Sequence, residues 1–229
     1  MARPLRSGPI VLKLGGSLLA SGRLGPIVSL IAAAVSPLVV VPGGGRFADA
    51  VRDAQTEAGF SDPLAHRMAL LAMHQTGLLI ADGSPRLEPA ETLAAIRRVL
   101  AAGRIPVWLP YRLASDDPHI PADWSITSDG LAARLAERLR LNRLVLVKSC
   151  RADVSRGLDR LAAEGVVDSA LPALARRARL AVEIIGPGEE QRLSELVAAA
   201  PFSGSRQSVP RSGRRRAGAV LGGLAHGEE

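Results

Sequence analysis

The sequence has little cysteine, few aromatic residues and no long apolar run. Cys150 is the single cysteine among 229 residues, which excludes an intramolecular disulfide and a cysteine metal cluster. No apolar run reaches the roughly 18 residues that a membrane-spanning helix requires. The apolar stretch near the N-terminus breaks at Gly15 and Gly16, so it does not predict a signal peptide. These absences favour a cytoplasmic protein without a membrane partner.

Lysine is also scarce. The chain contains 27 arginines but two lysines, Lys13 and Lys148. Because arginine serves at ordinary basic positions, each lysine is a candidate for a place that needs a compact ammonium group on a flexible stem. Chance survival of two lysines is the alternative explanation at this point.

The net charge of +7 raises the question of nucleic-acid binding. Residues 203–229 carry five arginines against two glutamates, and the remaining +4 is spread over about 200 residues. No aromatic-rich basic strand accompanies this charge, so a single-strand stacking surface is not indicated. We therefore expect no nucleic-acid partner, one folded domain over residues 1–201, and a basic, disordered tail over 202–229.

Short apolar segments alternate with helical patterns along the chain. Strands are expected at residues 9–14, 37–42, 105–111, 142–149 and 180–185. Helices are expected at 24–35, 46–58, 64–81, 88–103, 126–140, 171–178 and 189–200. This alternation predicts an α/β protein, a three-layer α/β/α sandwich with a mainly parallel central sheet. The helix over 64–81 is nearly apolar on all sides, which predicts that it is largely buried.

Glycine loops follow the first two expected strands. The first is Gly15, Gly16 and Ser17, just after Lys13, and the second is Gly43, Gly44 and Gly45. Open parallel sheets bind ligands beyond the carboxyl ends of their strands. Loops without side chains let backbone N–H groups approach phosphate oxygens, and the following helix dipole favours the same anion. Either loop alone could be an ordinary turn, but two together suggest a phosphate donor beside a phosphate acceptor.

Other phosphate-binding motifs fit less well. The segment GGGRFA matches the dinucleotide fingerprint G-x-G-x-x-A, but it follows the second strand, whereas that fingerprint belongs in the first strand-to-helix turn. A Walker A loop is absent from the sequence, which excludes a P-loop kinase.

An acidic residue and the second lysine follow later in the chain. Asp129 is expected in the first turn of a helix, and Lys148 ends the next strand, at the crevice above the sheet. An acidic residue there complements the helix dipole, so Asp129 could be a simple capping residue. Alternatively, its carboxylate faces the glycine loops and holds the lysine ammonium groups in position.

The order of these features resembles the amino acid kinase superfamily over roughly residues 9–200. The resemblance rests on K-x-GGS, VPGGG, and the T-S-D helix followed by a strand ending at Lys148. It implies that Asp129 organises the two lysines and that ATP phosphates meet Lys13, Gly15, Gly16, Ser17 and Lys148. It also implies that the acceptor contacts Gly43, Gly44 and Gly45. Mg²⁺ would be carried on the nucleotide rather than by a protein metal site, and the protein would form a homo-oligomer.

A closer resemblance is to the small kinases of methanofuran biosynthesis. It rests on GGGRFADAVRDAQ, SDPLAHRMALLAMHQ and WSITSDGLAA. These kinases phosphorylate an aminomethyl-furanmethanol phosphate to a diphosphate. The resemblance implies the same type of small-molecule phosphate substrate here. Other acceptors, such as UMP, isopentenyl phosphate or a carboxylate, stay open.

Further residues are candidates for contacts with the acceptor. Arg52 could grip its phosphate or lie on a solvated helix face. His66 could contact the acceptor or be a hydrogen-bonded core histidine. Ser128, next to Asp129, is a third candidate. Trp124 could pack on a furan ring or anchor its loop.

Phosphoryl transfer to a phosphate suits these residues. The reaction depends on positioning and charge stabilisation, and an acceptor phosphate needs no general base. A nucleotide-binding or regulatory protein that kept the fold and lost turnover is the alternative from a different class. The segment SCRADVSRG, which replaces the acidic-glycine turn usual in the family after Lys148, favours that alternative. Lys13, the glycine loops and Asp129 favour a kinase.

Overall fold

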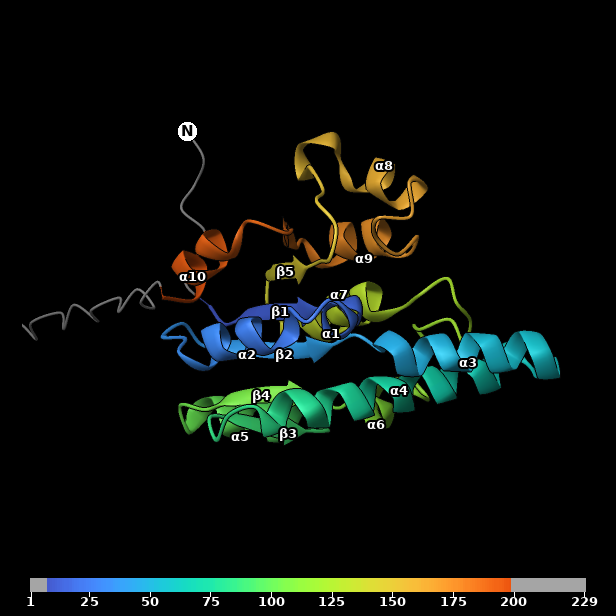
Figure 1. Ribbon diagram of the computed structural model, residues 1–229, viewed down its shortest axis with the longest axis horizontal. Coiled ribbons are helices and arrows are strands. Elements are labelled where there is room, and N and C mark those ends of the chain that lie inside the picture. The colour runs from blue at the N-terminus through green and yellow to red at the C-terminus, as the bar shows by residue number, and fades with distance from the viewer. Residues whose placement is uncertain (1–7, 199–229) are drawn as a thin grey trace, which may run out of the picture.

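The computed structural model describes residues 8–198, which form three layers: a central six-stranded sheet and a layer of helices on each of its faces (Figure 1). The strand order is β3-β4-β2-β1-β5-β6, and every pairing is parallel. The strands are β1 (Ile10–Leu14), β2 (Leu38–Pro42), β3 (Leu87–Ala90), β4 (Ile105–Trp108), β5 (Arg143–Val147) and β6 (Ala181–Ile185). The predicted α/β/α sandwich with a parallel sheet is confirmed.

Helices cover both faces of this sheet. The longer helices are α2 (Leu24–Ala32), α3 (Gly45–Ala58), α4 (Asp62–Asp82), α5 (Leu93–Ala101), α7 (Ser128–Leu139), α9 (Leu171–Ala178) and α10 (Glu190–Ala198). The shorter ones are α1 (Ser17–Ala20), α6 (Tyr111–Ala114), η1 (Val154–Arg156) and α8 (Leu158–Ala163). Among the described residues, no helix is long and apolar enough to cross a membrane.

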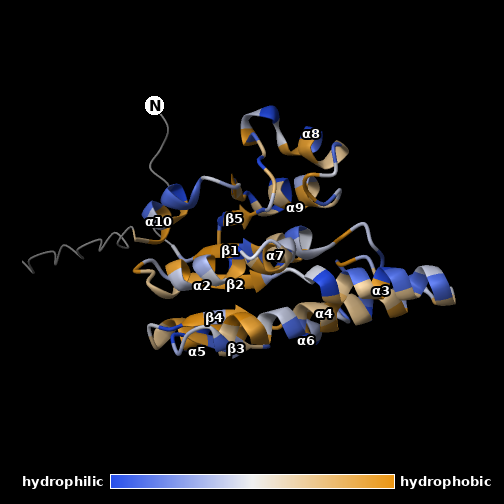
Figure 2. Cartoon of the chain, in the orientation of Figure 1, coloured by the Kyte–Doolittle hydropathy of each residue, from blue (hydrophilic) through white to orange (hydrophobic). Residues whose placement is uncertain are grey.

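The sheet separates two hydrophobic clusters. The central strands β1 and β2 are mostly hydrophobic (Figure 2). Side chains alternate between the faces of a strand, so Val11 joins the cluster of α5, α7 and α9, whereas Leu12 joins that of α2 and α10. Lys13 has the same parity as Val11, and its side chain therefore leaves β1 on the face that α7 covers. This parity brings the first lysine toward the helix that carries Asp129.

The predicted helix over 88–103 is wrong at its start. Residues Leu87–Ala90 form β3, and α5 begins only at Leu93, after Thr92 accepts a hydrogen bond from the N–H of Ala95 at 3.1 Å. Within residues 8–198, β3 pairs with β4 alone. Such an edge position tolerates Pro89, which lacks an N–H for a second partner.

The prediction that the apolar helix over 64–81 is largely buried is wrong for one face. In α4, Leu64, Leu71, Leu78 and Leu79 are exposed, while Leu70 and Met73 pack into the core. One side of α4 packs against α3, α6 and strands β2, β3 and β4, and the opposite side reaches the surface whatever its composition. The predicted strand over 105–111 is also shorter, because α6 begins at Tyr111. The predicted tail over 202–229 lies outside the described residues.

Candidate active site

The two glycine loops lie against each other at the carboxyl ends of β1 and β2. These strands are neighbours, with Leu14 opposite Pro42, so the loops that follow them emerge side by side. A Cβ on Gly16 would lie 2.0 Å from the N of Gly45, and a Cβ on Gly43 would lie 2.3 Å from the N of Gly16. The contact therefore requires glycine on both sides.

The backbone donors of these loops divide into two groups. Gly15 donates to the carbonyl of Val147 at 2.9 Å, and Gly43 donates to the carbonyl of Leu14 at 2.8 Å. Among residues 8–198, by contrast, no hydrogen-bond partner is present for the N–H groups of Gly16, Ser17, Gly44 and Gly45. Unpaired N–H groups on touching loops fit phosphate oxygens, and α3 adds its N-terminal dipole end at the second loop.

Both lysines of the chain converge on one buried carboxylate. The Nζ atoms of Lys13 and Lys148 lie 2.8 Å from Oδ1 and 2.5 Å from Oδ2 of Asp129, respectively. Lys148 also donates to the carbonyl oxygen of Val166 at 2.7 Å. Among the described residues, Asp129 is the polar partner of the Lys13 ammonium group. Within residues 8–198, Lys148 thus has two oxygen partners, whereas Lys13 has one.

The charge balance of this cluster is unusual. Asp129 is 2% exposed and Lys13 is 4% exposed. Burial by itself would raise the pKa of Asp129, but the ammonium groups of Lys13 and Lys148 outweigh burial and hold that pKa below its ordinary value. Two lysines and one carboxylate leave a formal excess of one positive charge beside the glycine loops. That excess suits a polyanionic ligand.

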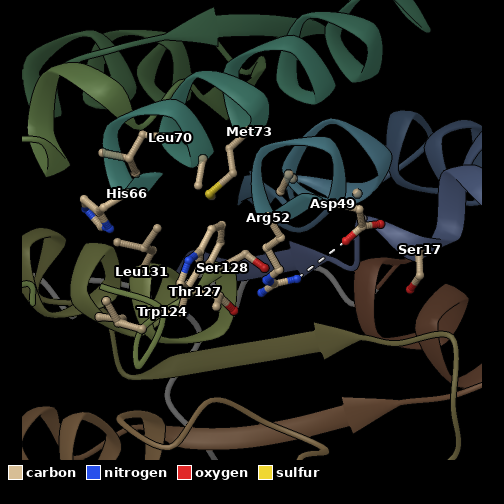
Figure 3. Close-up of a pocket in the computed structure, with 16 residues that line it drawn as sticks. Ser17, Asp49, Arg52, His66, Leu70, Met73, Trp124, Thr127, Ser128 and Leu131 are labelled. Carbon is tan, nitrogen blue, oxygen red and sulfur yellow. Dashed lines mark ion pairs between the residues drawn. The ribbon is translucent and has the colours of Figure 1, made fainter. Parts of the chain in front are cut away.

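A pocket of about 180 Å³ opens beside the two loops (Figure 3). Figure 3 shows Ser17 at one end and His66 at the other. Its apolar wall is formed by Ala48, Ala69, Leu70, Met73, Ile126 and Leu131, and its polar side chains include Asp49, Arg52, Thr127 and Ser128. The pocket thus joins anion-binding groups at the loops to an apolar compartment.

Arg52 and Trp124 form one wall of this pocket. The guanidinium carbon of Arg52 lies 4.3 Å from the centroid of the Trp124 ring, and its NH1 lies 3.5 Å from Asp49. The indole N–H of Trp124 donates to Oε1 of Gln55 at 2.7 Å, so Trp124 anchors its loop to α3. Arg52 remains 49% exposed and keeps donors available for an anion at the pocket mouth.

His66 is both buried and part of the pocket wall. Its side chain is 5% exposed, and burial lowers the pKa of its imidazole despite the opposing effect of Asp123. The neutral ring therefore carries one donor and one acceptor nitrogen at the apolar end of the pocket. His66 is therefore buried and also lines the pocket, and its contact with the acceptor stays a prediction.

The structure brings the predicted site residues together at the carboxyl ends of the central strands. Lys13, Asp129 and Lys148 form the buried cluster, and Ser128 lines the pocket next to it. Ser17 lies beside the turn after Lys148, where its Oγ donates to Oγ of Ser149 at 2.8 Å. Gly15 and Gly43 shape the loops without offering free N–H groups. Whether each residue acts in the predicted role stays a prediction.

Sequence reasoning missed several residues of this site. Met73 and Ile126 form part of the apolar wall, Thr127 adds a hydroxyl, and Val166 supplies the carbonyl that holds Lys148. Thr127 stands inside the T-S-D segment and could have been found there. Met73 has no sequence signal apart from its apolar helix, and the role of Val166 depends on a backbone atom.

Comparisons with known proteins agree with this arrangement. The profile of the Amino acid kinase family matches residues 8–151. The chain is 25% identical over 138 residues to [5-(aminomethyl)furan-3-yl]methyl phosphate kinase of Methanocaldococcus jannaschii, an alignment that covers 59% of this chain and 63% of that protein. The chain thus spans less than two thirds of the length of this curated relative.

Solved structures show the same fold. Uridylate kinase from Archaeoglobus fulgidus superposes with a TM-score of 0.64 at 18% identity, covering 85% of this chain and 97% of that one. UMP kinase from Bacillus anthracis gives a TM-score of 0.60 at 16% identity, with coverages of 83% and 93%. The family profile spans more than half of the chain and includes both glycine loops, Asp129 and Lys148. The chain belongs to the amino acid kinase family.

Proposed function

We propose that this protein is an ATP-dependent kinase that transfers a phosphoryl group to a small phosphate monoester and releases a diphosphate. The observation that carries the proposal is the pair of touching glycine loops, whose free N–H groups lie beside a buried cluster of two lysines and one aspartate. One loop suits the donor phosphates and the other suits the acceptor phosphate.

The chemistry needs no general base. An oxygen of the acceptor phosphate attacks the γ-phosphorus of ATP, the bond from that phosphorus to the β,γ-bridging oxygen breaks, and ADP leaves with the electron pair. Lys13 and Lys148 stabilise the negative charge that spreads over the transferred group, while Asp129 keeps both ammonium groups in place. Mg²⁺ on the nucleotide supplies further positive charge.

In this proposal, Mg²⁺ binds the phosphates of ATP and does not use Asp129 as a ligand. Both carboxylate oxygens of Asp129 face lysines. Within residues 8–198, no group of three His, Cys, Asp or Glu side chains could hold a metal ion. A magnesium ion carried by ATP phosphates, with several waters, requires no such group.

The acceptor pocket favours a small ring over a nucleoside. A cavity of about 180 Å³ with an apolar wall accommodates a compact ring with few polar substituents. His66 provides one neutral polar contact at its far end, and Arg52 stands at the mouth for the phosphate. These features, with the similarity to the furan phosphate kinase, support [5-(aminomethyl)furan-3-yl]methyl phosphate as the acceptor.

Phosphorus NMR tests both levels of this proposal. The purified protein is incubated with Mg-ATP and, separately, with the furan phosphate, UMP or isopentenyl phosphate. A diphosphate signal with the furan compound alone supports the full proposal. A signal with another acceptor supports the kinase and rejects the furan substrate. ATP binding without transfer to any of them would instead favour a regulatory protein that kept the fold.

We also propose that the exposed apolar face of α4 binds a second copy of the chain. Leu71, Leu78 and Leu79 are exposed on this helix, and Phe47 of α3 lies beside a shallow cleft with Leu78 and Leu79. A two-fold pairing would cover the same leucines in both copies. Light scattering after size-exclusion chromatography should give a dimer, and Leu71→Gln with Leu78→Gln should give a monomer.

A cytoplasmic location is also a proposal, supported by the single cysteine.

A further inference from the structure

The first turn of α7 is capped by a residue distant in sequence. Thr127 stands at the N-cap position, but its side chain makes no capping hydrogen bond to the helix. Instead, Oδ2 of Asp168 accepts hydrogen bonds from the N–H groups of Thr127 and Gly130, both at 2.7 Å. Oδ1 of Asp168 accepts from the hydroxyl of Thr127 at 2.5 Å. Asp168 therefore caps α7, a role that the side chain of the N-cap residue itself usually fills.

This capping contact leaves little freedom at the helix start. A Cβ on Gly130 would lie 3.3 Å from Oδ2 of Asp168 and 2.5 Å from Cγ1 of Ile126. Ser128 and Asp129, between the two capped N–H groups, are buried. The direction in which the Asp129 side chain leaves α7 is consequently set by how this turn is held.

The segment that carries Asp168 also contacts the lysine cluster and the pocket loop. Two residues before it, the carbonyl of Val166 accepts from Nζ of Lys148 at 2.7 Å. One residue after it, Oγ of Ser169 donates to the carbonyl of Ser125 at 3.1 Å. The connection between α8 and α9 thus holds the start of α7 and one catalytic lysine together.

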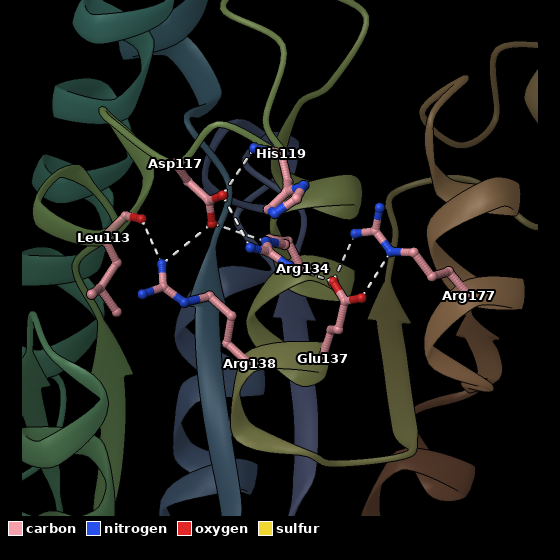
Figure 4. Close-up of polar contacts among 7 residues, drawn as sticks. All are labelled: Leu113, Asp117, His119, Arg134, Glu137, Arg138 and Arg177. Atoms are coloured by element: carbon pink, nitrogen blue, oxygen red, sulfur yellow. Dashed lines mark hydrogen bonds and ion pairs between the residues drawn. The ribbon is translucent and has the colours of Figure 1, made fainter.

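The remainder of α7 is anchored by other contacts (Figure 4). Arg134 and Arg138 bind the buried carboxylate of Asp117, with contacts of 2.9 Å and 3.3 Å. Glu137 binds Arg177 of α9 through two hydrogen bonds of 2.8 Å and 2.7 Å. Loss of Asp168 would therefore loosen the first turn while the body of the helix stays in place.

We propose that Asp168 is a positioning residue of the active site: by capping α7 from outside, it holds Asp129 between Lys13 and Lys148. The proposal rests on the phosphoryl transfer proposed above, in which the two ammonium groups must meet the transferred phosphate. Asp168 does not itself contact a reacting atom. Its effect on turnover arises from the placement of Asp129, because a misplacement of about 1 Å can cost about 100-fold in rate.

The scarcity of lysine gives a direct readout of this placement. Lys13 and Lys148 are the chain's two lysines, so ¹⁵N-lysine labelling of the untagged protein yields two side-chain ammonium signals. Both are expected to be visible in the wild type because the buried ion pairs slow proton exchange. Asp168→Ala should shift both signals and broaden that of Lys148 beyond detection. Asp168→Asn keeps one carbonyl acceptor for the two N–H groups and should restore signals near their wild-type positions.

Kinetics provide the second readout. With the acceptor found by phosphorus NMR, Asp168→Ala should lower kcat by about 100-fold while KM for ATP stays within about twofold, because the loop N–H groups remain. Asp168→Asn should recover most of the turnover. If Asp168→Ala does not fold, Asp168→Ser is used, since the shorter side chain cannot bridge the two N–H groups.

Two controls separate positioning from general loosening. Thr92→Ala removes the cap of α5, remote from the site, and Arg177→Ala removes the contact between α9 and the far part of α7. Both should leave kcat and the two ammonium signals unchanged. Asp168→Ala with unchanged ammonium signals, or with a turnover loss no larger than the controls show, would overturn the proposal. Absence of transfer in the wild type would reject the proposed kinase, while the NMR comparison would still decide the role of Asp168.

Discussion

Substitution of Gly16 by alanine tests the contact between the two glycine loops. A methyl group at this position would lie 2.0 Å from the N and 2.4 Å from the Cα of Gly45. Both neighbours are backbone atoms, so no side-chain rotation relieves the clash. To reach an ordinary contact of 3.4 Å, the loops must separate by about 1.4 Å.

This separation should affect catalysis more than stability. The loops hold the free N–H groups proposed for donor and acceptor phosphates, and a shift of about 1 Å can cost about 100-fold in rate. Overpacking typically costs about 1–3 kcal/mol, and each kcal/mol lowers Tm by roughly 2–4 °C in a chain of this size. We therefore expect Gly16→Ala to fold, to melt about 2–12 °C lower, and to lose at least about 100-fold in kcat/KM.

The assay is steady-state kinetics with the acceptor identified by phosphorus NMR, combined with calorimetric melting. Gly8→Ala is the matched control, because a Cβ on Gly8 meets nothing within 4 Å and this residue lies outside the helices and strands. This variant should keep full activity and stay within about 0.5 kcal/mol of the wild-type stability. If Gly16→Ala retained kcat/KM within threefold of the wild type, the loops would not bind the reacting phosphates as proposed.

Three other substitutions test separate parts of the reasoning. Lys13→Arg should lower kcat by about 100-fold with little change in Tm, because the planar guanidinium cannot replace the ammonium contact. A large drop in Tm together with the loss of kcat would show that Lys13 is a structural residue. His66 has a folded-state pKa below 6.5, so the unfolded chain binds the proton first and stability should fall as pH drops below 6.5. His66→Gln should reduce this dependence in urea titrations, and the remainder should come from His74, whose pKa is also lowered by burial. Arg86→Ala removes bonds to the carbonyls of Ala32 and Ala34 and should cost about 1–2 kcal/mol of unfolding free energy with unchanged kcat, whereas a loss of kcat would tie this distant corner to the active site.

The sequence predicted most of the regular structure because its apolar periods and glycine stops are local signals. Its errors have identifiable physical causes. Residues 88–90 look helical beside the pattern that follows, but they form the edge strand β3, and nothing local indicates that an open sheet edge is available to them. The exposed face of α4 shows that an apolar helix is not necessarily buried on all sides.

The candidate site was partly predictable for a similar reason. Lys13, Asp129 and Lys148 were indicated by rarity and by position at the ends of expected elements, and the family resemblance grouped them. Sequence left two explanations open for Trp124, and only the hydrogen bond to Gln55 shows that it anchors its loop. Asp168 gave no signal, since a carboxylate that caps a helix 38 residues earlier in the chain is indistinguishable from any surface aspartate.

The sequence by itself determined the alternation of strands and helices, the placement of glycine at two strand ends, and the presence of only two lysines. These properties depend on each residue and its near neighbours. Tertiary structure decided which loops touch, which carboxylate holds both lysines, and which backbone donors stay free. Those outcomes depend on the order of strands in the sheet, because that order places Gly16 against Gly45 and Lys148 beside Lys13 across residues that no local pattern connects.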